Sequence, residues 1–246
     1  MAAMNAGDRA ENLVTTRGLC RHFGGIRAVD GVDFALPEGE LRALIGPNGA
    51  GKTTFVSLLC GRVPPSSGEI TFAGADVTAL PAHERIRRGM AYTFQITSVF
   101  ANLTVRENVA LAVQRRLGRG GGALEAETDG ALARVGLLER ADQLARDLAY
   151  GHQRLLEIAM GLGQKPRLLI LDEPTQGLSE GEVADFIALI RAVSRVMTIL
   201  LIEHNMDVVM ALAERITVMD AGRILAEGSP DEIRANREVQ AAYLGG

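Results

Sequence analysis

Three short runs of consecutive apolar residues divide this chain, and a segment with helical periodicity follows each of them. The apolar runs cover 41–45, 168–171 and 198–202. Runs of this length are typical of parallel strands that are covered on both faces. The helices that follow are expected at 53–59, 183–193 and 206–213. This alternation predicts an α/β fold with a parallel sheet at its core.

The remaining segments have different patterns. Residues 13–34 and 69–72 have the pattern of short strands broken by glycine turns, which predicts a small antiparallel layer. From about 96 to 162 the periodicity is helical, and the glycine-rich segment 118–122 interrupts it as a surface loop. We expect helices here at 105–113, 124–135 and 155–162. The tail, 230–243, predicts two short helices.

These patterns predict one domain over 1–246. An α/β core with its antiparallel layer would comprise about 12–95 and 163–228, a helical subdomain about 96–162, and a helical tail 229–246. No signal peptide is predicted, and the strongest apolar run, 196–202, is too short to span a membrane. A net charge of −4 gives no general preference for nucleic acid. Cys20 and Cys60 lack metal-ligand spacing and indicate small buried side chains in a reducing cytosol.

The most specific motif follows the first apolar run directly. Residues 46–53 read GPNGAGKT and match the phosphate-binding P-loop pattern without a mismatch, in the required strand-to-helix context. The glycines allow successive N–H groups to turn towards phosphates, and Lys52 can reach the β- and γ-phosphates. The Thr53 hydroxyl can ligate Mg²⁺. A glycine-rich turn with a chance match is the alternative, and the context favours nucleoside triphosphate binding.

Two adjacent carboxylates end the second apolar run. Because successive strand residues face opposite sides, Asp172 and Glu173 are expected to have different tasks. Asp172 could hold Mg²⁺ beside Thr53, and Glu173 could polarise a water that attacks the γ-phosphate. The alternative is a polar strand end before a turn at Pro174, which becomes improbable with a complete P-loop upstream.

Two further polar residues follow apolar strands. The amide of Gln95 could contact Mg²⁺ or the attacking water, at a hinge into the helical segment. A neutral imidazole at His204 could hydrogen-bond the γ-phosphate. Taken alone, each residue is more often structural. A third segment, 148–154, leads into a helix and predicts a second anion site, for a nucleotide that another subunit holds.

Together these motifs resemble the ATP-binding cassette (ABC) ATPases, and the resemblance covers nearly the whole chain. The family order is P-loop, glutamine loop, signature loop, acidic strand end and switch histidine. The resemblance implies a P-loop NTPase fold, ATP and Mg²⁺ as cofactors, and a head-to-tail dimer. In that dimer, two ATP molecules lie between one P-loop and the opposing signature loop. It also implies that Phe23 stacks on adenine, for which core packing is the alternative.

The resemblance defines the predicted site. The nucleotide-binding residues are predicted to be Phe23, Val29, Gly46, Pro47, Asn48, Gly49, Ala50, Gly51, Lys52, Thr53, Thr54, Gln95, Leu148, Ala149, Tyr150, Gly151, His152 and Asp172. The predicted catalytic residues are Glu173, His204 and Gln95, and the predicted Mg²⁺ ligands are Thr53, Gln95 and Asp172.

Several segments look like the importer branch for branched-chain amino acids or related amides such as urea. They are 93–95, 103–108, 154–159, 203–207 and the end, 226–245, although a lipopolysaccharide-export group has similar tails. The resemblance implies an ATPase on the cytoplasmic face of the inner membrane. Its partners would be a second ATPase, identical or a sister chain, and two membrane permeases, with a periplasmic binding protein supplying the substrate. No nucleic-acid partner is expected.

The chain departs from the usual family pattern in its signature and in the loop after Glu173. The signature usually reads LSGGQ and here reads LAYGH, although Tyr at the position of Tyr150 is common in this branch. Ala149 lacks the hydroxyl that would donate to the opposing γ-phosphate, a loss of roughly 1–3 kcal/mol. Ser179 stands where Asp is usual, which puts coupling between the two sites in doubt.

Two rival functions follow from the same sequence. One is a soluble ATP-gated clamp in DNA repair or translation, which the single cassette, the absence of a heptad tract and the acidic balance disfavour. The other is a regulatory rather than catalytic nucleotide-binding subunit, which Ala149 and Ser179 suggest. Glu173 and His204 argue against that second function.

Overall fold

A parallel sheet forms the centre of the molecule, as the three apolar runs predict. The computed structural model describes residues 11–93, 98–117 and 123–244, so the predictions for Gln95 and the loop 118–122 fall outside the described residues. The sheet has the order β10-β9-β3-β8-β7-β6. Its strands are β3 (Leu41–Ile45), β6 (Met90–Thr93), β7 (Leu168–Asp172), β8 (Thr198–Ile202), β9 (Arg215–Asp220) and β10 (Arg223–Gly228). Only the β9–β10 pairing is antiparallel.

Alternating residues of the parallel strands face two separate hydrophobic clusters. In β7, Leu169 and Leu171 belong to one cluster, and Leu168 and Ile170 belong to the other. All four are fully buried. Because helices or a second sheet cover both faces, the strands need apolar residues at every position, which explains the unbroken runs.

The second sheet is antiparallel and has the order β2-β1-β4-β5. Its strands are β1 (Asn12–Phe23), β2 (Ile26–Pro37), β4 (Ser67–Phe72) and β5 (Ala75–Asp76). The prediction of short strands is wrong for the first two, which run for 12 residues each. Gly18 and Gly31 lie at register shifts between β1 and β2 and do not end either strand.

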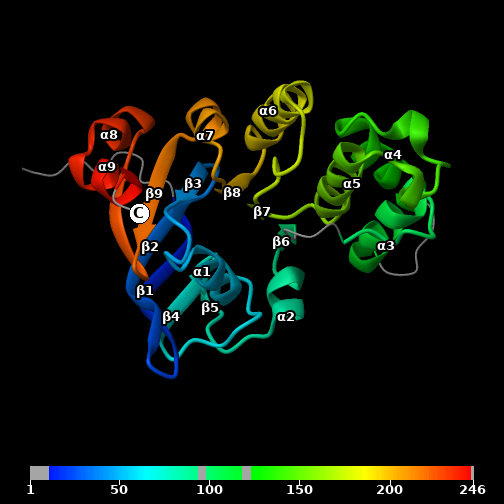
Figure 1. The fold of residues 1–246 in the computed structure, drawn as a ribbon. Coiled ribbons are helices and arrows are strands. Elements are labelled where there is room, and N and C mark those ends of the chain that lie inside the picture. The colour runs from blue at the N-terminus through cyan, green and yellow to red at the C-terminus, as the bar shows by residue number, and fades with distance from the viewer. Residues whose placement is uncertain (1–10, 94–97, 118–122, 245–246) are drawn as a thin grey trace, which may run out of the picture.

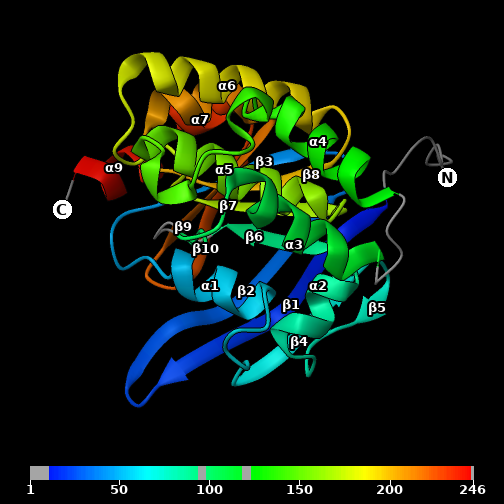
Figure 2. The same ribbon diagram turned by 90° about the vertical axis from the view of Figure 1, so that its right-hand side faces the viewer.

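Helix α1 (Lys52–Leu59) lies between the two sheets and joins their cores (Figure 2). A buried arginine closes its far end: Arg85 of α2 (Ala82–Arg87) donates to the carbonyls of Leu58 and Leu59 at 2.6 and 2.8 Å. The last carbonyls of a helix have no partner within the helix, so this guanidinium replaces water there.

Three helices form a separate layer at one end of the molecule. They are α3 (Val105–Leu117), α4 (Leu124–Arg134) and α5 (Tyr150–Gly163), and Figure 1 shows them in green on the right. Their existence confirms the predicted helices, although α5 begins five residues earlier than the expected Leu155. Helix α5 contacts the edge strand β6, and short 3₁₀ turns at Leu138–Arg140 and Ala145–Asp147 precede it.

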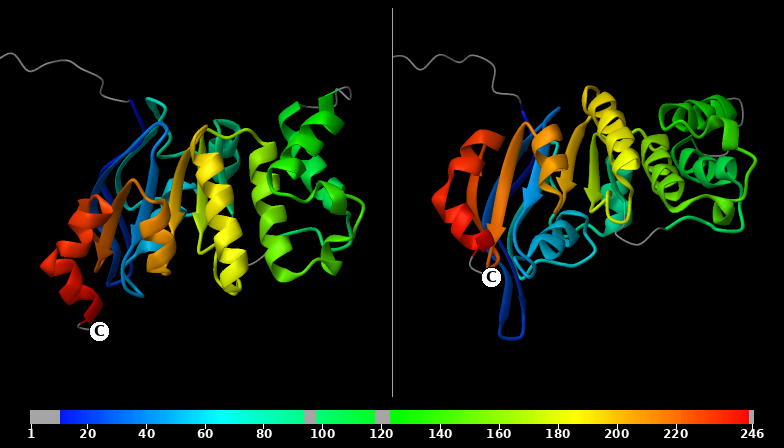
Figure 3. Two further views of the ribbon diagram at one scale, coloured as in Figure 1. Left: turned by 90° about the horizontal axis from the view of Figure 1, so that it is seen from above. Right: turned by 45° about the horizontal axis from the view of Figure 1, so that its top comes forward.

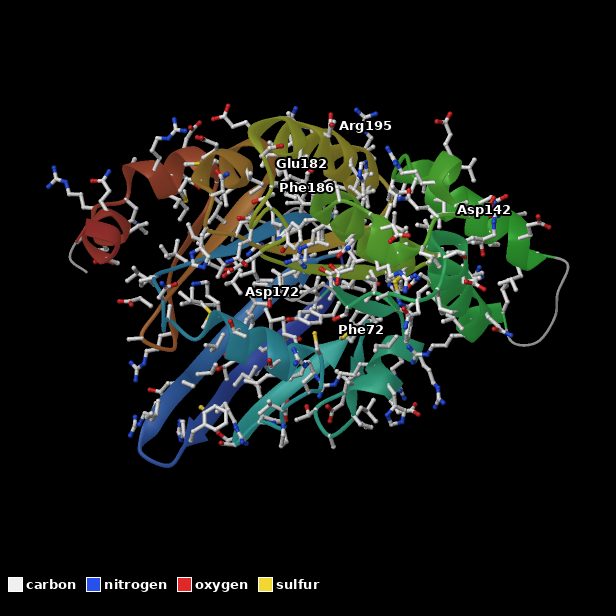
Figure 4. All side chains as sticks on the ribbon, turned by 45° about the vertical axis from the view of Figure 1, so that its right-hand side comes forward. Phe72, Asp142, Asp172, Glu182, Phe186 and Arg195 are labelled. Carbon is white, nitrogen blue, oxygen red and sulfur yellow. The ribbon has the colours of Figure 1, made fainter. Side chains whose placement is uncertain are left out.

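The face of the parallel sheet opposite α1 is covered by α6 (Glu180–Ser194) and α7 (Met206–Leu212). Phe186 of α6 is buried against the core (Figure 4). The predicted tail helices are α8 (Pro230–Ala235) and α9 (Arg237–Leu244), at the end of the molecule opposite the α3–α5 layer (Figure 3). None of the helices in the described residues is long and apolar enough to cross a membrane.

Candidate nucleotide-binding site

The loop between β3 and α1 is held in a conformation that requires glycine at two positions. Gly46 has a φ of 150° and Gly51 a φ of 100°. A Cβ atom would lie 2.1 Å from the carbonyl oxygen of Met219 at Gly46, and 2.2 Å from that of Ala28 at Gly51. Any side chain there would force the backbone of the loop apart, so the two glycines fix the loop against its neighbours.

Lys52 is buried at the start of α1. Its ammonium group donates to the carbonyl oxygens of Gly46 at 2.6 Å and Pro47 at 3.0 Å. Burial lowers the pKa of Lys52, and the carboxylates of Glu173 and Asp172 oppose that effect. The loop therefore contains a cation that is held in place and lies close to two acidic groups.

Asp172 ends β7 and is only 3% exposed (Figure 4). The hydroxyl of Tyr92, on the neighbouring strand β6, donates to its Oδ2 at 2.6 Å. Burial raises the pKa of Asp172, and the hydrogen bond from Tyr92 opposes the rise. The sequence analysis missed Tyr92. The signal that could have found it is its position one residue before the end of β6, a strand that pairs with β7.

Glu173 has a left-handed backbone conformation, with a φ of 48°. Such a φ is uncommon for a residue other than glycine and usually persists only where the surroundings enforce it. Here the Glu173 N–H donates to the carbonyl of Ile202, and its Oε1 lies 2.7 Å from Nε2 of His204. The structure therefore brings together two residues that are 31 positions apart and that the sequence analysis predicted to be catalytic.

Glu203 connects the loops that carry this pair, and the sequence analysis did not single it out. It is 3% exposed. One carboxylate oxygen accepts from the N–H and the hydroxyl of Thr175, and the other accepts from the N–H groups of His204 and Asn205. A buried carboxylate with four donors orders both loops. The signal was an acidic residue that directly follows a fully apolar strand.

A pocket of about 490 Å³ lies over the P-loop. Its lining consists of Ile26, Arg27, Ala28, Asn48, Gly49, Ala50, Gly51, Lys52, Thr53, Thr54, Glu173, His204 and Ala221. Most of the predicted P-loop residues, Glu173 and His204 therefore share one cavity. The sequence analysis missed 26–28 and Ala221, which come from β2 and from the turn after β9.

Gly46 and Pro47 lie outside that lining, and so do Val29, Phe23 and Asp172. Val29 is fully buried, so its side chain packs in the core of the antiparallel layer. Phe23 is 45% exposed at the end of β1, and the guanidinium carbon of Arg21 lies 4.5 Å from its ring centroid. Asp172 lies deeper in the protein, behind Glu173. Gln95 is not among the described residues.

The predicted signature segment, 148–152, lies at the start of α5 and contributes nothing to the described lining of this pocket. Ala149 is the N-cap residue of α5 and offers no side-chain hydrogen bond to the helix. Tyr150 is 44% exposed. A Cβ atom at Gly151 would lie 2.2 Å from Oε1 of Glu182, so α6 limits residue size there.

Ser179, which stands where the family usually has Asp, has a local structural role. Its hydroxyl accepts from the N–H of Glu182 at the start of α6, and the Glu182 carboxylate accepts from the N–H and hydroxyl of Ser179. This reciprocal arrangement is a capping box.

The residues of the pocket fit a nucleoside triphosphate with Mg²⁺. The glycine backbone, Lys52 and the N-terminus of α1 provide positive potential for phosphates. The Thr53 hydroxyl and the Asp172 carboxylate are oxygen donors of the kind that Mg²⁺ prefers.

Comparison with known proteins assigns this site to a family. A model of the ABC transporter family matches residues 29–176, and a model described as branched-chain amino acid ATP-binding cassette transporter matches residues 223–246. The chain belongs to the ABC transporter ATPases. As a member of this family, the protein is an ATP-hydrolysing subunit of a transport system.

Curated relatives match this ABC ATPase along almost its full length. The protein LivG of Salmonella typhimurium, a high-affinity branched-chain amino acid transport ATP-binding protein, is 41% identical and aligns over 96% of this chain and 99% of its own. BraF of Pseudomonas aeruginosa, described in the same words, is 40% identical over 95% of this chain and 98% of its own.

Solved structures support the same assignment. A nucleotide-free ATP-binding cassette from an ABC transporter superposes with a TM-score of 0.86 at 25% identity, over 96% of this chain and 100% of its own. A structure of the ADP conformation of an ATP-binding cassette of an ABC transporter gives a TM-score of 0.84 at 25% identity, over the same shares. The predicted fold is confirmed. As a transporter ATPase, the chain works with membrane-embedded partner subunits.

Proposed function

We propose that this ABC ATPase powers the import of branched-chain amino acids through partner permeases. The observation that carries the proposal is the contact between Glu173 and His204 over the P-loop, which provides a catalytic centre. The substrate class is supported by the matched tail, 223–246, and by the printed names of the full-length relatives. We place the protein at the cytoplasmic face of the inner membrane, bound to its permeases.

In this proposal, the P-loop backbone and Lys52 bind the phosphates of ATP, and Thr53 and Asp172 hold Mg²⁺, together with Gln95. The metal would neutralise charge that develops on the phosphates during transfer. Lys52 would exchange its two carbonyl acceptors for phosphate oxygens, which are stronger, charged acceptors. Exposed Phe23 would provide the ring on which adenine stacks.

Glu173 acts on the attacking water. Its carboxylate lines the pocket and lies within hydrogen-bond distance of the imidazole of His204. His204 is therefore placed to hold the carboxylate in position and to contact the γ-phosphate side of the pocket. In our mechanism Glu173 orients the water and accepts its proton, a role that typically contributes about 10²- to 10⁴-fold to the rate.

A second ATPase subunit completes the site. The signature segment of this chain lies at the exposed start of α5, outside its own P-loop pocket, which fits a head-to-tail pairing. Because Ala149 brings no hydroxyl, we propose that the helix N-terminus and the N–H groups near Gly151 make the contact with the partner's nucleotide. Closure of the two subunits would move the α3–α5 layer against the permeases near 100–108.

The test of the catalytic proposal is Glu173→Gln in the complex with its permeases and any sister ATPase. We expect ATP binding within about threefold of wild type and hydrolysis at these sites lowered by about 10²- to 10⁴-fold, because the amide cannot accept the proton. Glu180→Gln, an exposed change in the first turn of α6, is the matched control and should hydrolyse ATP as the wild type does. Unchanged hydrolysis in Glu173→Gln would reject the assignment.

The substrate class is tested by uptake into proteoliposomes that contain the complex and its binding protein. We expect ATP-dependent accumulation of radiolabelled leucine, isoleucine or valine, with no accumulation in the Glu173→Gln complex. Accumulation of urea or a short amide instead, with the same dependence on Glu173, would reject the amino-acid substrate and leave the ATPase assignment intact.

A further inference from the structure

A cysteine, a histidine and an aspartate meet at the hairpin of the antiparallel sheet, outside the lining of the nucleotide pocket. Cys20 and His22 are two positions apart on β1, in a stretch where the pairing with β2 is irregular. Asp30 lies on the neighbouring strand β2. One ligand atom from each residue lies within 4.8 Å of the other two, and His22 Nε2 is 3.6 Å from Asp30 Oδ1.

The surroundings hold two of these groups in place. The N–H of Gly31 donates to Sγ of Cys20 at 3.1 Å, and that sulfur lies 3.4 Å from the carbonyl oxygen of Gly18, to which the thiol donates. Arg223 donates to Oδ2 of Asp30 at 2.6 and 3.2 Å, and Arg27 also lies on that oxygen's side. The other oxygen, Oδ1, therefore faces His22. Hydrogen bonds that orient ligands from behind are a common feature of metal sites.

The chemistry of the three ligands selects the cation. A thiolate, an imidazole and a carboxylate are the set that Zn²⁺ and similar soft divalent ions bind, whereas Mg²⁺ and Ca²⁺ prefer oxygen alone. His22 is 38% exposed at its side chain, so a fourth position can be filled by water. We propose that Cys20, His22 and Asp30 form a binding site for a thiophilic divalent cation of the Zn²⁺ class.

The alternative is an ion pair between His22 and Asp30 with a neighbouring thiol that has no part in it. The two differ in what Cys20 does, because an ion pair does not need the sulfur. The nearby charges of Arg27 and Arg223 oppose a cation, so the affinity should be lower than that of a four-ligand structural zinc site. The cysteine spacing could not reveal this site, since two of its three ligands are not cysteines and one comes from another strand.

Metal binding would tie β1 to β2 near the end of the hairpin. Residues 26–28, which follow the turn on β2, line the nucleotide pocket, and Phe23 ends β1. The bound cation would thus restrict the segment that borders the adenine side of the pocket. The proposal does not depend on the transported substrate or on the catalytic role of Glu173.

The experiment is titration of the full-length protein, without a histidine tag, with Zn²⁺ by calorimetry and with Co²⁺ by absorption spectroscopy. We expect about one equivalent of Zn²⁺ and a near-ultraviolet thiolate-to-cobalt band. Cys20→Ser should lose that band and weaken Zn²⁺ binding at least tenfold, and His22→Gln should weaken Zn²⁺ binding at least tenfold. Cys60→Ala is the matched control, because Cys60 is buried in the core, and it should bind both metals as the wild type does.

A measurement of folding keeps the test decisive. Without metal, Cys20→Ser should have the thermal midpoint of the wild type within a few degrees. Zn²⁺ should raise the midpoint of the wild type and should not raise that of Cys20→Ser. Zn²⁺ binding that is equally tight in Cys20→Ser, or no cobalt–thiolate band in the wild type, would overturn the proposal.

Discussion

At the scale of single residues, the site depends on groups that hold the reactive ones in place. Tyr92 fixes Asp172, His204 contacts Glu173, and Glu203 orders the loops on which Thr175 and His204 lie. Except for the contact between Glu203 and its neighbour His204, these supporting contacts join residues that are distant in sequence. Each makes a prediction that differs from simple loss of a catalytic group.

Tyr92→Phe should shift the pH dependence of ATP hydrolysis. Burial already raises the pKa of Asp172, and the Tyr92 hydroxyl opposes that rise, so its removal should raise the pKa further. A hydrogen bond to a charged group contributes about 1.5–3 kcal/mol, and its loss here falls on the ionised carboxylate. Mg²⁺ needs the ionised carboxylate. As the pH is lowered, Tyr92→Phe should therefore lose activity at a higher pH than the wild type does.

The measurement is the ATPase pH profile of Tyr92→Phe and wild type at several Mg²⁺ concentrations. The acid limb of the variant should move to higher pH than that of the wild type, and added Mg²⁺ should move it back. A profile that coincides with the wild type at limiting Mg²⁺ would show that Tyr92 does not tune Asp172.

Glu203→Gln should destabilise the fold and slow hydrolysis together. In the wild type, the donors of Thr175, His204 and Asn205 share the Glu203 carboxylate. The amide of the variant keeps one acceptor oxygen and turns an NH₂ group towards the remaining donors, so buried N–H groups lose their partners. The expected cost is about 1–3 kcal/mol in the free energy of unfolding. Thr175→Ala, which removes one donor and leaves the carboxylate, should cost less. Urea unfolding without nucleotide measures both, and an order opposite to this one would contradict the argument.

At the scale of elements, helix ends connect the two predicted halves of the nucleotide site. Helix α6 begins at the Ser179 capping box, and the same Glu182 side chain lies against Gly151 at the start of α5. The departure from Asp to Ser at 179 therefore leaves a well-capped helix. Any effect of Ser179 on coupling between subunits therefore does not come from a poorly formed α6.

Ser179→Ala should lower the free energy of unfolding by about 0.5–2 kcal/mol, because the first turn of α6 loses its side-chain acceptor. Ser179→Asn is the control, since Asn is a comparable N-cap residue, and should lie near the wild type.

Hydrogen bonds from Ser179 lower the pKa of Glu182. The contribution of Glu182 to the stability of the fold is therefore present above the ordinary glutamate pKa. It is lost as the pH falls through the lowered pKa of Glu182 in the folded protein. The difference between Ser179→Ala and wild type should shrink in acid.

The elements were largely predictable, because β3 and β8 match their apolar runs and the P-loop match fixes what lies between β3 and α1. Local pattern is enough for a strand that is buried on both faces. It fails where the decisive contact is distant: Arg85 closes α1 from 26 residues away, and Tyr92 reaches Asp172 across 80. Val29 shows the converse, since its backbone neighbour Ala28 lines the pocket and its own side chain points into the core.

At the scale of the whole molecule, one chain offers a P-loop pocket and a separate predicted signature segment, and in our proposal a second subunit completes the site. We expect Glu173→Gln with Mg-ATP to form a dimer, with itself or with a sister ATPase, and to return to monomer with Mg-ADP. A stable interface usually buries about 1,200–2,000 Å² in total. Light scattering on a size-exclusion column measures the mass. A monomer under saturating Mg-ATP, with permeases and any sister subunit present, would contradict the composite site.

The order of the parallel sheet has one more consequence. The strands that carry the P-loop, the switch histidine and the acidic pair, β3, β8 and β7, are neighbours, and β6 is the last strand beside them. The α3–α5 layer is attached along that outermost strand. A movement of the layer would therefore act on the edge of the sheet, where β6 pairs with β7, and on the contact of α5 with α6. The strands nearer the centre, β3 and β8, can keep their pairing while the α3–α5 layer moves.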